Sequence, residues 1–318
     1  MIFIYILLGL VLLTLLISLG AFIIAFYCSD KQKAYLNNPK LPLEGAEYAE
    51  FNEVILNNVN IIEACKCEEV RIKAKDGKML FGRYYHRKDG LPVEIFFHGY
   101  RANGVRDGSG AFEVSGEAGF NLLIVDQRSS GNSEGNVITF GVKEKLDVLS
   151  WIDYVINRFG KEVKIILAGI SMGASTVLMA SELDLPENVK CITADCGYSS
   201  QTEIINKVGK EMKMPIKLLF PFLKLGAFIY GGFNIDSRTP LDAVKNAKVP
   251  IFFIHGDCDT FVPCHMCDEL YDACTSPKRK LIVKNAAHGV SFFVDNNSYK
   301  DYLHEFFKSS GVITDWER

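Results

Sequence analysis

Residues 163–180 read VKIILAGISMGASTVLMA, and this stretch decides the fold. The apolar run Val163–Ala168 predicts a strand buried on both faces, and the small residues after Gly173 predict a helix. Between them lies a glycine–x–serine–x–glycine turn with Ser171 at its centre. Strand, tight turn and helix in this order predict a nucleophile elbow, in which the glycines allow a sharp turn that lifts the serine hydroxyl above the sheet. The alternative is that Ser171 only caps the N-terminus of the helix.

The same alternation of strand and helix patterns extends from Val70 to the C-terminus. The later apolar runs are continuous, as in strands that are covered on both faces, and Asp76-Gly77 predicts a hairpin between the first two strands. This alternation favours an α/β fold with a mostly parallel, doubly wound sheet and helices on both faces. The expected strands are 70–75, 79–86, 93–97, 121–125, 163–168, 191–194, 249–254 and 280–283, and the expected helices are 107–118, 142–159, 172–183, 265–274 and 297–309.

A serine hydroxyl is a poor nucleophile near neutral pH, so it needs a base, and the base needs an acid that orients it. The expected base is His288, which follows the last predicted strand, whereas His98 and His255 end earlier strands in other settings. The acid should end the preceding strand, where Asp257 and Asp259 are both available. The order serine, acid, histidine suits a nucleophile elbow, and Asp259 leaves room for one helix and one strand before the histidine.

An oxyanion that develops during acyl transfer needs two backbone N–H donors. One is expected from Met172, the residue after the nucleophile. The other is expected from the loop after the strand that ends at Phe97, which reads HGYRANG over residues 98–104. Because Gly99 lets this backbone turn, Tyr100 is the expected second donor.

From about Val70 to the C-terminus, the chain resembles the α/β-hydrolase superfamily, in particular bacterial hydrolases related to membrane-anchored BEM46-like proteins and to acyl-peptidase and cinnamoyl-esterase-type enzymes. The matching motifs are 98–100 (HGY), 126–133 (DQRSSGNS), 169–173 (GISMG), 240–244 (PLDAV), 255–263 (HGDCDTFVP) and 287–289 (AHG). The resemblance implies a triad of Ser171, His288 and Asp259. It favours Asp259 over Asp257 because the acid in those families stands three residues after the glycine of His-Gly.

This sequence departs from the family pattern at Ser129-Ser130, where relatives often carry Gly-His or Gly-Gly. That loop is more often structural than catalytic, so the departure leaves the triad unaffected. Asp126 and Arg128 of the same loop are interpreted as a pair that braces it. The motifs specify the fold and the triad, but they do not specify a substrate.

The first segment, Ile2–Ser29, carries no charge and is rich in Ile, Leu, Val and Phe. At about 1.5 Å per residue, such a helix spans a hydrocarbon core of about 30 Å. A cleavable signal peptide is the alternative, but no Lys or Arg precedes the run, which is also too long for an h-region. The expected organisation is a transmembrane anchor at 1–29, a juxtamembrane linker at 30–68, and a hydrolase domain at 69–318 with a small helical cap at 198–248.

The net charge and the cysteine content limit which partners the protein can bind and which compartment it can occupy. The net charge of −3 gives no basic excess for binding nucleic acid. Nine cysteines, an odd number, do not suit a disulfide framework and favour a reducing compartment. Cys264 and Cys267 have the CxxC spacing of zinc or redox sites, but no second CxxC follows at zinc-ribbon spacing. Lys31 and Lys33 follow the membrane segment, so the positive-inside rule predicts a hydrolase domain on the cytoplasmic side.

Together these residues predict a serine hydrolase that cleaves ester-type acyl bonds of a small molecule through an acyl-enzyme on Ser171, without cofactor or metal. A carboxylesterase or a lipase-like enzyme ranks first. A peptidase or an acyltransferase with the same triad remains open, as does a membrane-anchored scaffold with a vestigial site. The cap segment 212–230 is rich in Leu, Phe and Met, which predicts a preference for apolar acyl groups.

Overall fold

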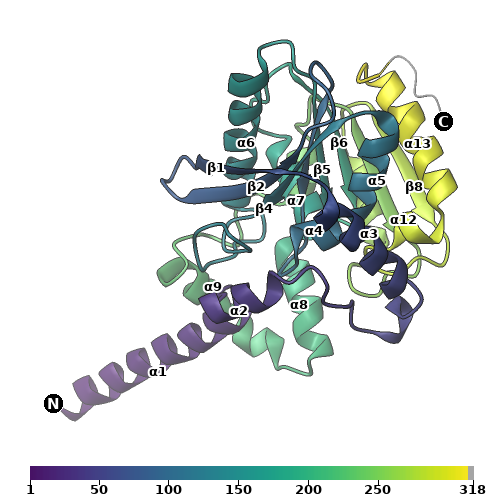
Figure 1. Cartoon of the computed structure of the whole chain (residues 1–318). Helices are drawn as coiled ribbons and strands as arrows, with labels where there is room; N and C mark the ends of the chain where they lie inside the picture. Colours follow the sequence, from purple (N-terminus) through teal and green to yellow (C-terminus); the bar gives the residue numbers. More distant parts are fainter. Residues whose placement is uncertain (314–318) are drawn as a thin grey trace.

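The structure is a computed structural model that describes residues 1–313, and its centre is a single eight-stranded sheet (Figure 1). The strands are β1 (Glu68–Lys73), β2 (Met79–Tyr85), β3 (Val93–Phe97), β4 (Asn121–Asp126), β5 (Ile165–Ile170), β6 (Val189–Asp195), β7 (Ile251–Gly256) and β8 (Lys278–Val283). Their order across the sheet is β1-β2-β4-β3-β5-β6-β7-β8. β1 and β2 form the expected antiparallel hairpin and β2 pairs antiparallel with β4, whereas β3 to β8 pair in parallel. The predicted α/β fold with a mostly parallel sheet is confirmed.

The helices that the sequence predicts between the strands all form, with their ends displaced by a few residues. The helices are α1 (Ile2–Ala25), α2 (Asp30–Leu36), α3 (Asn52–Ala64), α4 (Gly104–Asp107), α5 (Ser109–Ala118), α6 (Glu144–Phe159), α7 (Met172–Ala180), α8 (Gln201–Glu211), α9 (Ile216–Ile229), α10 (Pro240–Val244), α11 (His265–Ala273), α12 (Ser291–Val294) and α13 (Asn296–Ser309), with a short 3₁₀ helix at Ala46–Tyr48. The expected helix 107–118 is in fact two, since α4 ends at Asp107 and α5 begins at Ser109.

Helices cover both faces of the sheet. On one face α6, α7, α10 and α11 pack into a cluster that contains Trp151 and Phe253. On the other face, α5, α12 and α13 pack around Phe252 and Phe307, and α3 and α4 pack beside them. Because successive strand residues point to opposite faces, the neighbours Phe252 and Phe253 of β7 lie in different clusters. Because helices bury both faces of the sheet, the strands β3, β4 and β7 are apolar almost throughout.

The segment 30–68, which the sequence predicts to be a linker, contributes to the folded body. Ile55, Val59 and Ile62 of α3 are buried in a cluster with Tyr85 and Phe96 of the sheet. Helical spacing of three and four residues places these three side chains on one face of α3, which explains why they pack together. Sequence reasoning noted the amphipathic pattern of this segment but could not show which surface would receive its apolar face.

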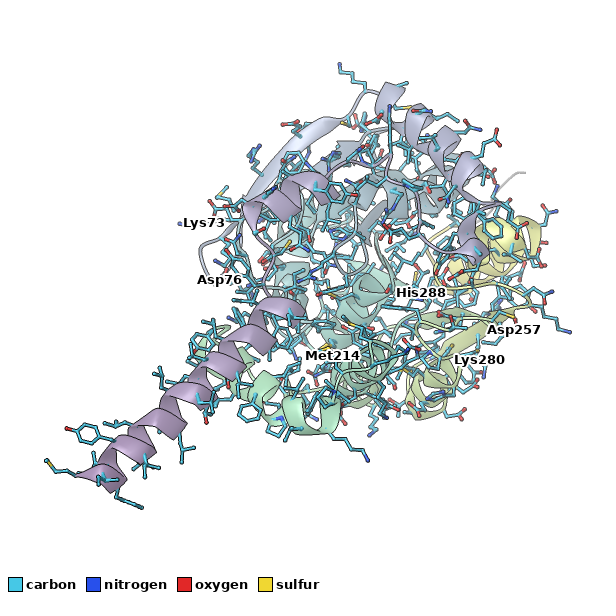
Figure 2. All side chains as sticks on the ribbon, turned by 90° about the horizontal axis from the view of Figure 1, so that it is seen from below. Lys73, Asp76, Met214, Asp257, Lys280 and His288 are labelled. Atoms are coloured by element: carbon cyan, nitrogen blue, oxygen red, sulfur yellow. The ribbon has the colours of Figure 1, made fainter. Side chains whose placement is uncertain are left out.

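The N-terminal helix α1 projects away from the sheet over its first half and packs against the cap over its second half (Figures 1 and 2). The large side chains from Ile2 to Leu16 are mostly exposed, whereas Phe22 and Phe26 are buried in a cluster with Leu223 of α9 and Phe233. Within residues 1–313, α1 is the one helix long and apolar enough to cross a membrane, a property that signal sequences and buried core helices share. Since only Ser18 and Phe22 of α1 are buried, it is not a core helix.

Candidate active site

The turn between β5 and α7 holds Ser171 in a conformation that few residues adopt. Its backbone has φ 56° and ψ −119°, which is strained for a side chain with a Cβ atom. The two flanking glycines make the turn possible: a Cβ on Gly169 would lie 2.4 Å from the carbonyl carbon of Gly173, and a Cβ on Gly173 would lie 2.0 Å from the carbonyl oxygen of Phe97. The tight strand–turn–helix that the glycine–x–serine–x–glycine pattern predicts is therefore present.

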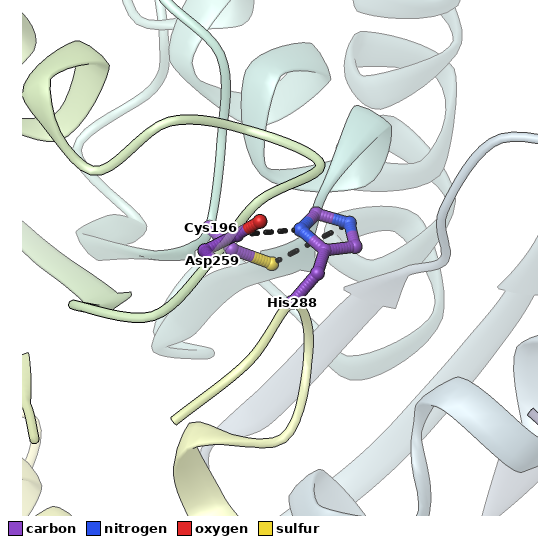
Figure 3. Close-up of side chains that lie close together, drawn as sticks. All are labelled: Cys196, Asp259 and His288. Atoms are coloured by element: carbon purple, nitrogen blue, oxygen red, sulfur yellow. Dashed lines mark hydrogen bonds and ion pairs between the residues drawn. The ribbon is translucent and has the colours of Figure 1, made fainter. Parts of the chain in front are cut away.

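His288 lies in the loop after β8 and faces this serine. Its Nε2 is 2.9 Å from Ser171 Oγ, and its Nδ1 is 2.7 Å from Asp259 Oδ2 (Figure 3 draws the second contact). In a neutral imidazole with the proton on Nδ1, the ring donates to the carboxylate and accepts from the serine hydroxyl. The three residues expected from three distant parts of the sequence thus form one hydrogen-bonded chain.

The carboxylate of Asp259 is buried and held by four donors. Its Oδ1 accepts hydrogen bonds from the backbone N–H groups of Phe261 (2.9 Å) and Val262 (2.8 Å). Its Oδ2 accepts from His288 and lies 3.2 Å from Nε2 of His255. Burial on its own raises the pKa of Asp259, but the hydrogen bonds from His255 and His288 outweigh burial and lower this pKa to about 2. The carboxylate therefore stays ionised at neutral pH and can orient an imidazole and stabilise its charged form.

His255 is a further neighbour of Asp259 that sequence reasoning did not assign. It is fully buried at the end of β7, and its Nε2 donates to the Val262 carbonyl (2.8 Å) as well as facing Asp259. Burial opposes protonation, yet the hydrogen bond to Asp259 raises the pKa of His255. Its position four residues before Asp259 was the available signal, because His255 lies at the end of β7 and Asp259 lies in the short loop that follows this strand.

The other two candidates from the sequence have different partners. Asp257 is exposed, and its Oδ1 accepts a hydrogen bond from the backbone N–H of Asn285 (2.7 Å). It therefore braces the loop that carries His288. His98 is buried, and both of its ring nitrogens are hydrogen-bonded. Its Nδ1 donates to the Gly99 carbonyl (2.8 Å), and its Nε2 accepts from the backbone N–H of Gln127 (3.0 Å). Neither residue contacts Ser171.

Cys196 lies beside His288, a position that the sequence analysis did not predict. Its Sγ is 4.0 Å from His288 Nε2 (Figure 3). Within residues 1–313, the one group of side chains close enough to share a metal ion is Cys196, Asp259 and His288, whose donor atoms lie within 4.8 Å of one another. Burial raises the pKa of the Cys196 thiol well above its ordinary value, and a neutral thiol is a poor metal ligand. These three residues suit proton transfer better than metal binding.

The CxxC pair does not form a site of its own. All nine cysteines are free thiols, so none is bonded to another. Cys267 of α11 is buried in the core, Cys264 just before this helix is partly exposed, and burial raises the pKa of both thiols. Asp126 and Arg128, which were expected to brace their loop as a pair, each have a different partner. The two residues do not pair with each other: Asp126 accepts from Arg83 (2.9 Å), and Arg128 forms a two-pronged contact with Asp147 (2.6 Å).

The loop that is expected to supply an oxyanion donor lies directly against Ser171. A Cβ on Gly99 would be 3.5 Å from Ser171 Cβ, and the Gly99 N–H already donates to Asp107 (2.9 Å). The next N–H along the loop, that of Tyr100, has no acceptor within residues 1–313, nor has the N–H of Met172. Two unpaired amides beside Ser171 are what an oxyanion hole requires.

The same loop is bonded to the end of α1. The hydroxyl of Tyr100 donates to the carbonyl of Ala25 (2.8 Å), and its ring stacks on Phe140 with centroids 5.0 Å apart. The guanidinium of Arg101 donates to the carbonyls of Ile24 (3.1 Å) and Tyr27 (2.8 Å). A cation at these carbonyls is favourable because the C-terminus of a helix carries partial negative charge.

Two cavities meet at Ser171. The larger, about 400 Å³, is almost entirely apolar and lies between α1 and the cap helices α8 and α9. The smaller, about 250 Å³, is lined by His288, Tyr48, Arg106 and Glu44 among others. A nucleophile between an apolar and a more polar space can hold an ester whose two sides differ in polarity.

The apolar residues of the cap divide between the cavity and the solvent. Leu223 of α9 is buried and lines the larger cavity together with Met214, whereas Phe228 is 68% exposed. Phe220 packs at the edge of the cap cluster. The segment 212–230 therefore does not bury all its apolar side chains on itself.

The fold and the geometry of this site are those of the α/β-hydrolase class of proteins. Residues 84–210, less than half of the chain, match the model of the X-Pro dipeptidyl-peptidase (S15) family. A curated relative is the protein YqkD of Bacillus subtilis, 26% identical over 63% of this chain and 66% of the relative, just under two thirds of its length.

Solved structures with the same fold include hydrolases of two Pyrococcus species. The Pyrococcus furiosus esterase Pf2001 has a TM-score of 0.64 and 21% identity, with 85% of this chain and 96% of the esterase covered. The acylaminoacyl peptidase of Pyrococcus horikoshii has a TM-score of 0.58 and 20% identity, with 82% of this chain and 45% of the peptidase covered. At these identities the likeness establishes the fold, and the activity has to be argued from the site.

Proposed function

We propose that the chain is a serine carboxylesterase that hydrolyses esters with apolar acyl groups. The observation that carries this proposal is the position of Ser171: its hydroxyl is 2.9 Å from His288 Nε2, and the residue lines an apolar cavity of about 400 Å³. Cavities of about 300–1,000 Å³ are usual for small-molecule ligands. The cavity's lining offers no charged partner for a polar acyl group other than Arg101, which is bonded to α1.

The proposed reaction follows from the hydrogen-bonded chain. Ser171 Oγ attacks the ester carbonyl while His288 Nε2 takes the hydroxyl proton, and Asp259 stabilises the imidazolium. The carbonyl oxygen becomes an oxyanion that the Tyr100 and Met172 amides stabilise. The tetrahedral intermediate collapses, the C–O bond to the alcohol breaks, and His288 protonates the leaving alcohol. Water, deprotonated by His288, then attacks the acyl-enzyme and releases the carboxylic acid and Ser171.

Labelling with a fluorophosphonate probe tests the nucleophile. We expect the full-length protein to be labelled, and Ser171→Ala to lose both labelling and hydrolysis of p-nitrophenyl butanoate while keeping its melting temperature. Full labelling of Ser171→Ala would overturn the assignment. Absence of labelling and turnover in the wild type would favour the scaffold alternative.

A peptidase is the second candidate, because the chain matches the S15 family model over residues 84–210 and because Glu44 lies in the wall of the smaller cavity. A carboxylate there could bind the N-terminal amine of a peptide. Comparison of kcat/KM for p-nitrophenyl esters with that for X-Pro and N-acylaminoacyl p-nitroanilides separates the two activities. A higher kcat/KM on either anilide would replace esterase by peptidase, and Glu44→Gln should lower it only for the X-Pro anilide, whose N-terminal amine is free. An acyltransferase would transfer the acyl group to an added alcohol, so the ratio of new ester to free carboxylic acid would rise with the alcohol concentration.

We also propose that α1 anchors the enzyme in a membrane with the hydrolase domain on the cytoplasmic side. The proposal is supported by the length and exposure of α1 and by Lys31 and Lys33 directly after it. Nine free thiols agree with a reducing compartment.

A further inference from the structure

The second half of α1 forms one wall of the larger cavity. Ile17, Gly20, Ala21, Ile24 and Ala25 all line it. Their spacing of three and four residues places them on a single face of the helix. Other parts of the lining come from α8 and α9, and Ser171 lines the same cavity. The helix that the sequence predicts only as an anchor is therefore also part of the space beside the nucleophile.

Several bonds fix α1 in this position. Tyr100 and Arg101 bond to carbonyls of its last turn and of Tyr27. Just past its end, the chain pairs with the loop after β4, where Cys28 N–H donates to the carbonyl of Asn136 (2.8 Å). Against α9 the approach is close, since a Cβ on Gly226 would lie 2.4 Å from the carbonyl oxygen of Ser18. Small residues at such contacts let two helices pack tightly.

The length of α1 places this wall at the edge of the bilayer. The first bond from α1 to the cap is that of the Tyr230 hydroxyl to the carbonyl of Leu15 (3.1 Å). The residues from Ile2 to Leu15 span only about 21 Å at about 1.5 Å per residue. Because a hydrocarbon core is about 30 Å thick and needs about 20 residues, it would extend to about Ala21, which lines the cavity.

The cap carries side chains suited to a membrane surface. Met212 and Leu218, at the junction of α8 and α9, are 60% and 67% exposed. Lys210, Lys213 and Lys217 alternate with them and are exposed as well. Exposed apolar side chains interleaved with lysines are typical of segments that lie in the interface of a bilayer with anionic lipids.

We propose that the second half of α1 is part of the acyl-binding site, and that the substrate is a long-chain acyl ester drawn from the bilayer in which α1 lies. The acyl chain occupies the cavity between α1 and the cap, with its ester carbonyl at Ser171. The inference deepens the proposed esterase function and rests on it. Each methylene that the cavity removes from water contributes about 0.8 kcal/mol, so a long chain is preferred over a short one.

A matched pair of glycine variants tests the wall. A Cβ on Gly20 or on Gly9 meets nothing within 4 Å, so both positions accept a larger side chain. Gly20 lines the cavity, whereas Gly9 lies on the projecting half of α1. In full-length protein in phosphatidylcholine nanodiscs, Gly20→Leu should lower the ratio of kcat/KM for p-nitrophenyl dodecanoate to that for the butanoate by about tenfold, since the leucine displaces several carbon atoms of the chain. Gly9→Leu should leave this ratio unchanged. Equal ratios in the two variants would overturn the proposal.

A binding measurement separates this inference from the esterase function. In the Ser171→Ala background, dansyl-undecanoic acid should bind with increased fluorescence. Addition of Gly20→Leu should raise the Kd of this fatty acid by about tenfold. Gly9→Leu should have no effect. If the wild type hydrolyses no ester but this difference appears, the esterase function fails and the cavity assignment stands. Equal Kd values for Gly20→Leu and Gly9→Leu would overturn the cavity assignment.

A third experiment tests whether the acyl ester reaches Ser171 from the bilayer or from water, by supplying the ester either in the same vesicle as the enzyme or in a separate one. The full-length protein is reconstituted into vesicles with a fluorogenic diacyl lipid ester, which does not exchange between vesicles on the time scale of the assay. Hydrolysis should be at least tenfold faster when enzyme and lipid share a vesicle than when they are in separate vesicles. Equal rates would show that the substrate reaches Ser171 from water and would overturn the route through the bilayer.

Discussion

The hydroxyl of Tyr100 donates a hydrogen bond to the carbonyl of Ala25 over 2.8 Å, although 75 residues separate them in the chain. Tyr100 carries one of the two unpaired amides beside Ser171, and Ala25 is the last residue of α1. The helix that we propose to lie in the membrane thus supports the loop that we propose to stabilise the oxyanion.

Removal of this hydrogen bond should slow turnover without removing the amide. Tyr100→Phe keeps the backbone N–H and the ring stacked on Phe140 but loses the bond to Ala25. Because a typical hydrogen bond contributes about 0.5–1.5 kcal/mol, kcat should fall about three- to tenfold with little change in KM for a short ester. Tyr35→Phe, an exposed tyrosine on α2, serves as control. A rise in KM with unchanged kcat would show that Tyr100 acts in binding rather than in positioning.

The two aspartates after β7 should differ in their effect on catalysis. Asp259→Asn removes the charge that orients and stabilises His288, so kcat should fall about 10³- to 10⁴-fold. Asp257→Asn should change kcat less than about threefold, because Asp257 is exposed and its carboxylate braces the Asn285 amide rather than His288. Steady-state kinetics of both variants on p-nitrophenyl butanoate decide the assignment. A larger loss for Asp257→Asn would reverse it.

The contact between α1 and α9 should contribute to stability. A Cβ on Gly226 would meet the Ser18 carbonyl oxygen at 2.4 Å, so Gly226→Ala must push the helices apart. Overpacking of this kind costs about 1–3 kcal/mol, and the melting temperature of the full-length protein in detergent should fall. Gly9→Ala is the control, because its Cβ meets nothing within 4 Å. Equal melting temperatures for the two variants would show that α1 is not packed on the cap in solution.

Glu94 should make stability depend on pH. It is buried on β3 with one carboxylate oxygen unpartnered within residues 1–313, and burial raises its pKa from 4.5 to about 8. A folded-state pKa above the unfolded value gives stability that is full below about pH 4.5 and is lost as pH rises toward about 8. Glu94→Gln cannot ionise, so its melting temperature relative to wild type should increase between about pH 5 and pH 8. The exposed Glu69→Gln should show a flat difference, and a flat difference for Glu94→Gln would contradict the prediction.

The orientation of the domain can be read from protease protection. If the C-terminal flank of α1 faces the cytoplasm, as Lys31 and Lys33 predict, protease added outside intact cells should leave the domain uncut. Permeabilised cells serve as the control for accessibility. Digestion in intact cells would place the domain outside.

The sequence alone determined the elbow, the triad candidates and the positions of the strands along the chain. These features are local: the apolar run before Gly169 and the small residues after Gly173 dictate strand, turn and helix without reference to distant residues. The position of His288 and of Asp259 just past predicted strands was enough to place them at one edge of a parallel sheet. Only the choice between Asp257 and Asp259 needed the resemblance to known hydrolases.

Only the tertiary structure decided what surrounds these residues. The burial of His255 against Asp259, the position of Cys196 beside His288 and the packing of α3 on the sheet depend on which surfaces meet in space. The same holds for α1, whose uniform apolar composition predicts a membrane helix but contains no periodic signal that marks Ile17 to Ala25 as a wall. Apolar packing is non-directional, so a pattern shows that a face will be buried but does not show against which partner.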